Sequence, residues 1–488
     1  MKNYVICAVV YSDTIDGLKN QAVRAKNAGV HIIEYRVDGI QDLNIEEFGR
    51  MIKLVNLPSI VSSRSEWNNE AITAPKLGRE ELITRLLTVE PDFINLEYPI
   101  DIPILSQING KTKIVLSMLD FDGMSKIDFR SVKEYAQNDE RILVKISATP
   151  NSVNNLRQLW KWGDELKKDK IDHVVLGMGE LGKLSRIKSL ELGNAWMYGR
   201  VDSKNGEPYL PGMLDISLLQ KAFDDESWHL ASIGKLNNYF IHELYNRILS
   251  SSEVDGVFLD VPITMQPELD QLLLWISDGL LDGLLVNEPW RKDVVPILNY
   301  LDASVIHVGE ANTIALTKEG LTGYNTQVEG VRRVLSAYSM KRLKRIYIEG
   351  TDLYARSVIA AVREFAELIV VRGIREEPLV ELKTNFPEIE LAQNSFTDHF
   401  DLIVSSNLPQ QGFEKIDPVP PKFMKNAKLV FDILNLSNEP SPTIETAQRL
   451  NIPFITGKEF AINTALASFE IWTKQAISPS VISIEDLL

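Results

Sequence analysis

The first 220 residues alternate short runs of β-branched and aliphatic residues with stretches that carry apolar residues at helical spacing. Parallel strands need crossover helices, and eight strand–helix units close a sheet on itself. The sequence therefore predicts a (β/α)8 TIM barrel over residues 1–222. The eight expected strands are VICAVV (5–10), HIIEYRV (31–37), PSIVSS (58–63), FINLEY (93–98), KIVLSML (113–119), RILVKIS (141–147), HVVLGM (173–178) and NAWMYG (194–199).

Three charged residues share one face of the second expected strand. Glu34, Arg36 and Asp38 are spaced by two residues, and every second side chain of a strand points to the same face. On an open sheet they would form a solvent-exposed charge ladder, and this alternative stays open. A closed barrel has no solvated strand face, so there the three charges are expected at the C-terminal mouth, where such barrels carry their chemistry.

Further cationic residues fall at the ends of other expected strands. Lys145 lies in the otherwise apolar RILVKIS, Arg64 follows the third strand, and Arg186 ends the Gly-punctuated stretch LGMGELGKLSR. A desolvated lysine near other cations becomes a nucleophile for carbonyls, and arginine binds carboxylates through its planar fork. We expect a site for a small anionic, hydroxylated keto acid that forms a Schiff base with Lys145.

Composition narrows the classes of partner. A formal net charge of −15 over 488 residues argues against nucleic-acid and anionic-membrane partners, because both require basic patches. No apolar segment reaches the roughly 20 residues of a membrane-spanning helix. The predicted partner is a small molecule; the sequence makes no prediction of the oligomeric state.

Cysteine and histidine usage points to a reducing setting without metal. Cys7 is the single cysteine and cannot form an internal disulfide, so we expect a cytoplasmic protein. The six histidines stand singly and form no metal-binding motif; they are His31, His173, His229, His242, His307 and His399.

Four motifs in order, EYRVD (34–38), Arg64, VKISATP and MGELGKLSR, resemble type I 3-dehydroquinate dehydratase over nearly all of residues 1–220. The resemblance implies a barrel enzyme that forms an imine with 3-dehydroquinate and eliminates water to give 3-dehydroshikimate. It assigns the imine to Lys145. It places the substrate among Glu34, Arg36, Arg64 and Arg186, with Asp38 helping to orient the arginines.

The same comparison reveals departures from the family pattern. Leu119 stands where the family has its catalytic histidine, and Asn68 stands where it has the glutamate that steadies this histidine. In the loop that closes over substrate, Tyr209 and Met213 replace polar ligands. Because general acid–base help is commonly worth about 10²–10⁴ in rate, we expect an impaired dehydratase.

Residues from 229 onward resemble shikimate dehydrogenase, through GLLVNEPWRKDVVPILNYLD, GEANTI, GLTGYNTQVEG and TGKEFAINTALASFEIWT. The resemblance implies a substrate lobe at 229–330, completed by a C-terminal helix at about 458–488, and a doubly wound Rossmann-like lobe at 331–457. The expected strands are VFLDV, LDGLLV, SVIHVG, RIYIEG, LIVVRG, DLIVSS, KLVFDI and PFITG.

The dehydrogenase motifs are degenerate as well. Arg291 occupies the catalytic lysine position and Gln327 the position of its partner aspartate, although Asn312 remains. The dinucleotide-binding turn keeps Gly350 alone and places Asp352 where phosphates would lie. We therefore expect the NADP site to be lost, no cofactor to bind and no hydride transfer to occur.

Three hypotheses follow for the whole chain. The first is a slow dehydroquinate dehydratase-like lyase fused to an inactive dehydrogenase half. The second is a non-catalytic pseudoenzyme that senses or regulates shikimate-pathway metabolites. The third is a purely structural role, which the retention of costly buried charges disfavours.

Overall fold

The computed structural model describes residues 4–67, 70–71, 78–108, 110–201, 211–234, 239–252, 254–373, 375–392, 399–406, 419–479 and 482. Two predicted positions, Asn68 and Tyr209, lie outside these ranges. The chain divides into two compact units: Met1–His229 with Leu259–Leu272, and Leu230–Phe258 with Leu273–Leu488.

The first unit is built on a curled parallel sheet, as predicted. Its strands run in the order β11-β10-β1-β2-β3-β6-β7-β8-β9, and Ala195 N, just before β10, donates to His173 O of β9 at 2.8 Å, which closes the ring. The eight barrel strands are β1 (Ile6–Tyr11), β2 (Ile32–Arg36), β3 (Ser59–Ser62), β6 (Phe93–Glu97), β7 (Lys113–Asp120), β8 (Ile142–Ala148), β9 (His173–Gly177) and β10 (Met197–Arg200). Short strands β4 (Glu66–Trp67), β5 (Glu70–Ala71) and β11 (Leu214–Asp215) complete the unit.

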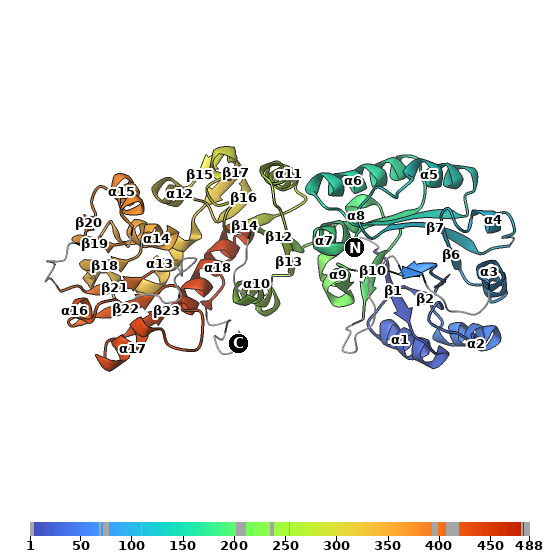
Figure 1. Cartoon of the computed structure of the whole chain (residues 1–488), viewed down its shortest axis with the longest axis horizontal. Helices are drawn as coiled ribbons and strands as arrows, with labels where there is room; N and C mark the ends of the chain where they lie inside the picture. The colour runs from blue at the N-terminus through green and yellow to red at the C-terminus, as the bar shows by residue number, and fades with distance from the viewer. Residues whose placement is uncertain are drawn as a thin grey trace. The chain divides into compact units, whose positions relative to one another are not determined.

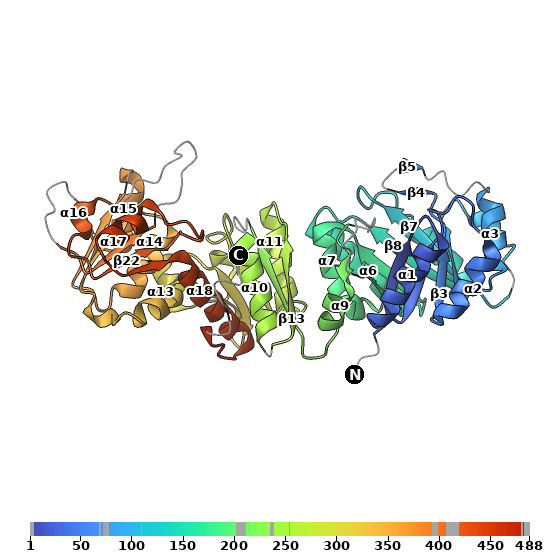
Figure 2. The ribbon, with the colours of Figure 1, turned by 90° about the horizontal axis from the view of Figure 1, so that it is seen from below.

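Helices follow the barrel strands and lie outside the curled sheet (Figures 1 and 2). Side-chain caps begin several of them: Thr14 accepts a hydrogen bond from Gly17 N, and Ser152 from Asn155 N. Their apolar faces are buried against the strands, as with Leu18, Ala22 and Ala25. The helices are α1 (Ile15–Asn27), α2 (Ile45–Val55), α3 (Arg79–Leu87), α4 (Ile102–Leu105), α5 (Phe129–Asn138), α6 (Val153–Lys168), α7 (Gly179–Ile187), α8 (Ser189–Leu192) and α9 (Ile216–Ala222).

The second unit holds two six-stranded sheets. The first is mixed, in the order β13-β12-β14-β16-β17-β15; the second is parallel, in the doubly wound order β20-β19-β18-β21-β22-β23. The first comprises β12 (Trp228–Ile233), β13 (Gly256–Val261), β14 (Gly283–Val286), β15 (Tyr300–Leu301), β16 (Thr313–Thr317) and β17 (Gly320–Tyr324). The second comprises β18 (Arg345–Glu349), β19 (Leu368–Arg372), β20 (Glu390–Leu391), β21 (Leu402–Ser405), β22 (Leu429–Asp432) and β23 (Phe454–Thr456).

Two helices connect these sheets: α13 (Thr326–Ser336) leads from the first to the second, and α18 (Gly457–Thr473) returns (Figure 1). They approach closely, because a Cβ on Gly330 would lie 2.3 Å from Thr464 Oγ1. Trp472 Nε1 then donates to Ile314 O of the first sheet at 3.0 Å. The other helices are α10 (Tyr239–Ser251), α11 (Gln266–Ser277), α12 (Ala303–Val308), α14 (Leu353–Val362), α15 (Glu376–Asn385), α16 (Pro421–Met424) and α17 (Pro442–Arg449), with 3-10 turns at Val295–Ile297 and Met340–Arg342.

One expected strand is wrong. SVIHVG forms helix α12, because Asp302 caps it by accepting from Ser304 N at 2.9 Å and Gly309 ends it at φ 82°. Val305 and Val308 are buried while Ile306 is 67% exposed, which is helical spacing. The capping interactions therefore favour a helix here more than the β-branched residues favour a strand.

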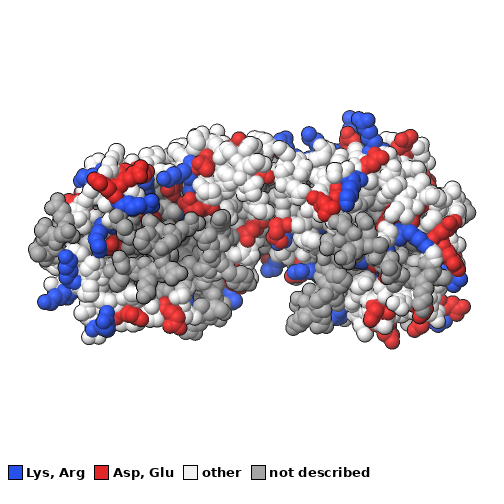
Figure 3. Space-filling model, in the orientation of Figure 1, with Lys and Arg blue, Asp and Glu red and all other residues white. Residues whose placement is uncertain are grey.

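On the face drawn in Figure 3, the described basic and acidic residues are interspersed. Within the described ranges, the structure has no helix of the length and apolarity that crossing a bilayer requires.

Candidate active site in the barrel

The strand register places alternate side chains on the inner face of the barrel. Lys145 of β8 is the neighbour of Ser117 on β7, and Ser117 is the neighbour of Glu97 on β6. Lys145 Nζ lies 2.8 Å from Glu34 Oε2, although β2 and β8 are not adjacent in the sheet. The two side chains can meet only by crossing the barrel interior, so the strand-two charges point inward rather than toward solvent.

Arg64 joins this pair from the end of β3. Its guanidinium NH2 lies 3.7 Å from Glu34 Oε1, and NH1 lies 3.6 Å from Glu97 Oε1. Lys145, Glu34 and Arg64 are each at most 5% exposed. Two cations and a carboxylate thus share a space from which water is largely excluded.

Arg36 and Asp38 lie next to this cluster but are engaged with each other. Arg36 NH2 donates to Asp38 Oδ2 at 2.6 Å, and the guanidinium stacks 4.7 Å from the Tyr11 ring centroid. Asp38 Oδ1 also accepts from the Arg64 backbone N at 3.3 Å. Asp38 therefore binds the side chain of Arg36 and the main chain of Arg64.

Arg186, on α7, is completely buried. Its Nε donates to Gly177 O at the end of β9, at 3.0 Å, whereas NH1 and NH2 have no hydrogen-bond partner among the residues that the structure describes. Burial lowers the pKa of Arg186 to about 10. A guanidinium fork with two unpaired nitrogens is suited to a carboxylate.

Burial and neighbouring charges alter the proton affinities of the central pair. Burial lowers the pKa of the Lys145 amine and Arg64 acts in the same direction, while Glu34 opposes them. Burial alone would raise the pKa of Glu34, but Lys145 and Arg64 lower it to about 2. The Tyr198 ring centroid lies 4.0 Å from Lys145 Nζ. The amine is thus held as an ion pair yet shifted toward its nucleophilic neutral form.

Sequence reasoning missed a second ionic group at the same end. Arg79 of α3 binds both oxygens of Asp101 at 2.6 Å, Glu97 Oε2 at 3.1 Å and Ser63 O at 2.9 Å. Glu97 could have been found, because it ends an expected strand as Arg64 does. Arg79 and Asp101 carry no comparable signal, since their meeting depends on where α3 packs.

Several buried polar atoms of the barrel unit lack a hydrogen-bond partner within the described protein. Leaving such an atom unpaired costs roughly 1–3 kcal/mol unless water or a ligand binds it. The barrel interior therefore favours a polar occupant. They include Glu34 Oε1, Ser62 Oγ, Arg64 Nε and NH1, Asn95 Oδ1 and Nδ2, Ser147 Oγ, Arg186 NH1 and NH2, and Tyr198 Oη.

Leu119 and Met213, the two departing barrel positions that the structure describes, have no proton-transferring side chain. Leu119 is half-buried on the inner face of β7, beside Ser147 of β8. Met213 is buried next to β11. His173 contacts Ile171 O and Leu192 O, and His31 Nδ1 accepts from Ile6 N, so both rings are engaged near strand starts, at the rim opposite the mouth.

In the second unit, the residues at the dehydrogenase motifs belong to a buried polar network. Arg291 Nε donates to Val286 O at 3.1 Å. Gln327 Oε1 accepts from Ser357 Oγ at 3.3 Å, and Asn312 Nδ2 donates to Thr326 Oγ1 at 2.9 Å. These contacts give each residue a structural partner, although Arg291 NH1 has none among the described residues.

The turn after β18 does not fit a dinucleotide pyrophosphate. Asp352 Oδ1 accepts from Tyr354 N and Ala355 N at 3.1 and 3.0 Å, so a carboxylate of the chain itself occupies the α14 N-terminus where a phosphate would bind. Burial raises the pKa of Asp352 to about 7. Arg372, a candidate phosphate ligand, lies 3.4 Å from Glu349.

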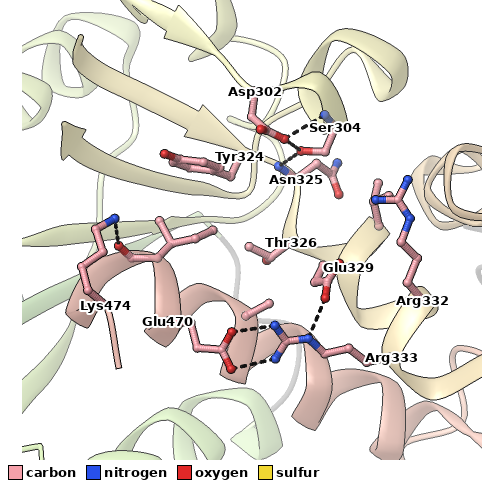
Figure 4. A pocket seen from close by; sticks show the side chains of 13 residues that line it. Asp302, Ser304, Tyr324, Asn325, Thr326, Glu329, Arg332, Arg333, Glu470 and Lys474 are labelled. Carbon is pink, nitrogen blue, oxygen red and sulfur yellow. Dashed lines mark hydrogen bonds and ion pairs between the residues drawn. The ribbon is translucent and has the colours of Figure 1, made fainter. Parts of the chain in front are cut away.

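A pocket of about 380 Å³ lies where β17, α12, α13 and α18 meet (Figure 4). Its charged residues pair with one another: Arg333 binds both oxygens of Glu470, at 2.9 and 2.6 Å, and its Nε binds Glu329 at 2.9 Å. The two bonds to Glu470 connect α13 to α18, and the bond to Glu329 lies within α13. Within the described residues, no group of three or more His, Cys, Asp or Glu could hold a metal ion.

The fold and site describe a β/α barrel with a buried lysine–carboxylate pair at its centre, followed by a Rossmann-containing unit. Residues 6–226 match the model of the type I 3-dehydroquinase family. This part of the chain is therefore similar to type I 3-dehydroquinases, and the whole chain is similar to fusions of such a domain with a shikimate dehydrogenase.

Two relatives match almost the whole chain. The chloroplastic bifunctional 3-dehydroquinate dehydratase/shikimate dehydrogenase of Arabidopsis thaliana is 22% identical over 501 residues, covering 96% of this chain and 82% of that protein. The shikimate biosynthesis protein AroDE of Chlamydia pneumoniae is 24% identical over 483 residues, covering 97% and 96%. Among solved structures, shikimate dehydrogenase from Aquifex aeolicus matches with a TM-score of 0.48 at 18% identity, covering 54% of this chain and 98% of that chain.

Proposed function

We propose that the barrel binds a 3-dehydroquinate-like keto acid and forms an imine with it through Lys145. The observation that carries the proposal is the 2.8 Å Lys145–Glu34 pair inside the barrel, together with buried polar atoms of the barrel that lack partners among the described residues. A hydroxylated, anionic ligand would supply those partners. The match of residues 6–226 to the type I 3-dehydroquinase family supports this substrate class.

Each charged residue then has a role. The unpaired Arg186 nitrogens would bind the ligand carboxylate. Arg64, which already faces Glu34 and Glu97, would hold hydroxyl groups on the opposite side. Lys145 would attack the ketone as the neutral amine, and Glu34 would stabilise the cationic imine that follows loss of water.

Turnover is expected to be slow. Leu119 occupies the histidine position of the family pattern and cannot carry a proton. The missing general acid–base help would cost about 10²–10⁴ in rate. The product would be the dehydrated keto acid, 3-dehydroshikimate.

We assign the second unit no dehydrogenase activity. Asp352 caps α14 in place of a phosphate, and Arg291 stands at the position of the catalytic lysine. The expected test result is that millimolar NADP does not raise the melting temperature; tight binding of NADP would overturn this assignment.

The experiment for the barrel is imine trapping. The full-length protein is incubated with 3-dehydroquinate and borohydride, and its intact mass is measured. A mass increase that disappears in Lys145→Ala and persists in Lys183→Ala, a surface lysine paired with Glu180, supports the imine. Absence of any adduct would contradict it.

A non-catalytic sensor of shikimate-pathway metabolites is the second candidate. The observation that favours it is the combination of Leu119 on the inner face with the self-capped α14 in the other unit. Thermal stabilisation by 3-dehydroquinate or shikimate without an adduct would select this candidate over the lyase.

A further inference from the structure

We propose that Ser147 is the proton relay of the barrel, acting between bound ligand and water at the level where the family has its histidine. This inference rests on the proposed imine at Lys145. It adds a residue that neither the motifs nor the family comparison assigns.

The strand register positions Ser147 beside Leu119, the residue at the histidine position of the family. Leu119 of β7 pairs with Ser147 of β8, and both follow by two residues the Ser117–Lys145 pair. Because side chains alternate along a strand, Ser147 and Lys145 share the inner face, with Ser147 closer to the C-terminal mouth. A hydroxyl thus lies on the neighbouring strand, at the height of the leucine.

The hydroxyl is also available. Ser147 is completely buried, yet its Oγ has no hydrogen-bond partner within the described protein. A hydroxyl both donates and accepts, so it can pass a proton without carrying a charge. A buried residue with this capacity and no partner is suited to a ligand or a water molecule.

Ser62 Oγ of β3 also has no partner among the described residues, but β3 is adjacent to neither β7 nor β8. Several other polar side chains of the inner face are committed or chemically unsuited. Ser117 Oγ donates to Leu96 O at 3.1 Å, and Glu97 is held by Arg79 and Arg64. Glu34 is held in its ion pair with Lys145. The Asn95 amide does not transfer protons at neutral pH.

Tyr198 is a weaker alternative for a geometric reason. It presents the face of its ring to Lys145, with Nζ 4.0 Å from the ring centroid. This arrangement stabilises a cation on the lysine nitrogen. It suits charge stabilisation of the imine rather than a proton relay.

The atoms and charges of the proton relay balance with water as the only co-reactant. In the first step, the C–H bond next to the imine carbon breaks and its electron pair forms the enamine C=C bond, while the imine nitrogen becomes neutral. That proton passes to Ser147 Oγ as the serine's own proton passes to water. In the second step, the enamine electrons expel the hydroxyl group, which takes the proton back through Ser147 and leaves as water.

The test measures exchange and turnover in the full-length protein. With 3-dehydroquinate in deuterated water, Ser147→Ala is expected to lower both kcat and deuterium exchange at the carbon next to the imine carbon by about ten-fold, with KM within two-fold. The matched control is Ser117→Ala, which removes a committed hydroxyl and is expected to change kcat less than two-fold. Thermal unfolding of each variant checks that it folds.

A second variant background distinguishes a proton-relay role of Ser147 from a packing role. In Leu119→His, the restored imidazole makes the serine redundant, so Ser147→Ala is expected to change kcat less than two-fold there. An equal loss in both backgrounds, or no difference between Ser147→Ala and Ser117→Ala, overturns the relay. An adduct trapped on Lys145 without measurable exchange in the unaltered protein also overturns it, whereas no adduct at all contradicts the proposed function itself.

Discussion

In the barrel, Lys145 and Glu34 meet 2.8 Å apart across the interior, and buried nitrogens and oxygens of the barrel have no partner in the part of the chain that the structure describes. At the corresponding edge of the second unit, Asp352 turns its carboxylate onto the amides of its own helix. The first arrangement leaves room for a ligand's polar groups, and the second already supplies its own anion.

The difference lies in how far the polar groups of the two sites are already satisfied. The barrel holds a charged cluster that would be costly without an occupant, and Leu119, which cannot carry a proton, lies on the same inner face. In the second unit, buried polar residues such as Arg291, Gln327 and Asn312 bond to main-chain and side-chain partners, although Arg291 NH1 has none within the described residues. Buried groups without a partner are therefore better evidence for a ligand than the fold itself.

The largest expected effect is on the barrel's stability. Lys145→Met leaves Glu34 buried with Arg64 as its remaining cation, so the free energy of unfolding should fall by roughly 3–5 kcal/mol at pH 7. Because the pKa of Glu34 is lowered to about 2, its contribution is present above about pH 4.5 and is lost toward pH 2. The defect should shrink over that window, as measured by urea unfolding.

Two companion variants make this test specific. Lys145→Met combined with Glu34→Gln removes both charges and should recover most of the loss. Arg291→Met makes the equivalent change in the second unit, where the guanidinium Nε bonds a main-chain carbonyl, and should cost less than about 1 kcal/mol. Equal losses for Lys145→Met and Arg291→Met would refute the contrast between the units.

A change in stability of intermediate size is expected when Asp352 is replaced. Its pKa is raised to about 7 by burial, so the folded state binds its proton more tightly than the unfolded state. Stability should therefore decrease as pH rises from about 4 to 7. Asp352→Asn keeps a capping oxygen and removes the charge, and should stabilise the second unit by roughly 2 kcal/mol at pH 8 and little at pH 4.

The measurement is urea unfolding at both pH values, with hydrogen exchange of α14 peptides to locate the change. Asp302→Asn is the matched control, since Asp302 caps α12 in the same way. A stabilisation by Asp352→Asn that does not depend on pH would show that the carboxylate is not strained by burial. Tight NADP binding to Asp352→Asn alone would show that this carboxylate is the main obstacle to the cofactor.

The sequence predicts those features that follow from periodicity. All eight barrel strands form within three residues of their expected ends, and the alternation of Glu34, Arg36 and Asp38 correctly predicts that they face the interior. It does not predict the Arg79–Asp101 pair, which depends on the packing of α3, or helix α12, whose caps override its β-branched residues. Which polar atoms stay unpaired also depends on distances that a pattern does not contain.

The smallest expected effect concerns the ion pairs that join the two connecting helices of the second unit. Glu470 binds Arg333 through two bonds but is 27% exposed on its side chain, so Glu470→Gln should cost only about 0.5–1 kcal/mol, and less in 1 M salt. Glu329→Gln, which removes only the pair within α13, should cost about 0.3–0.5 kcal/mol. A loss above 3 kcal/mol for Glu470→Gln would mean that the second unit also stores its stability in a buried charge pair, and the contrast with the barrel would then fail.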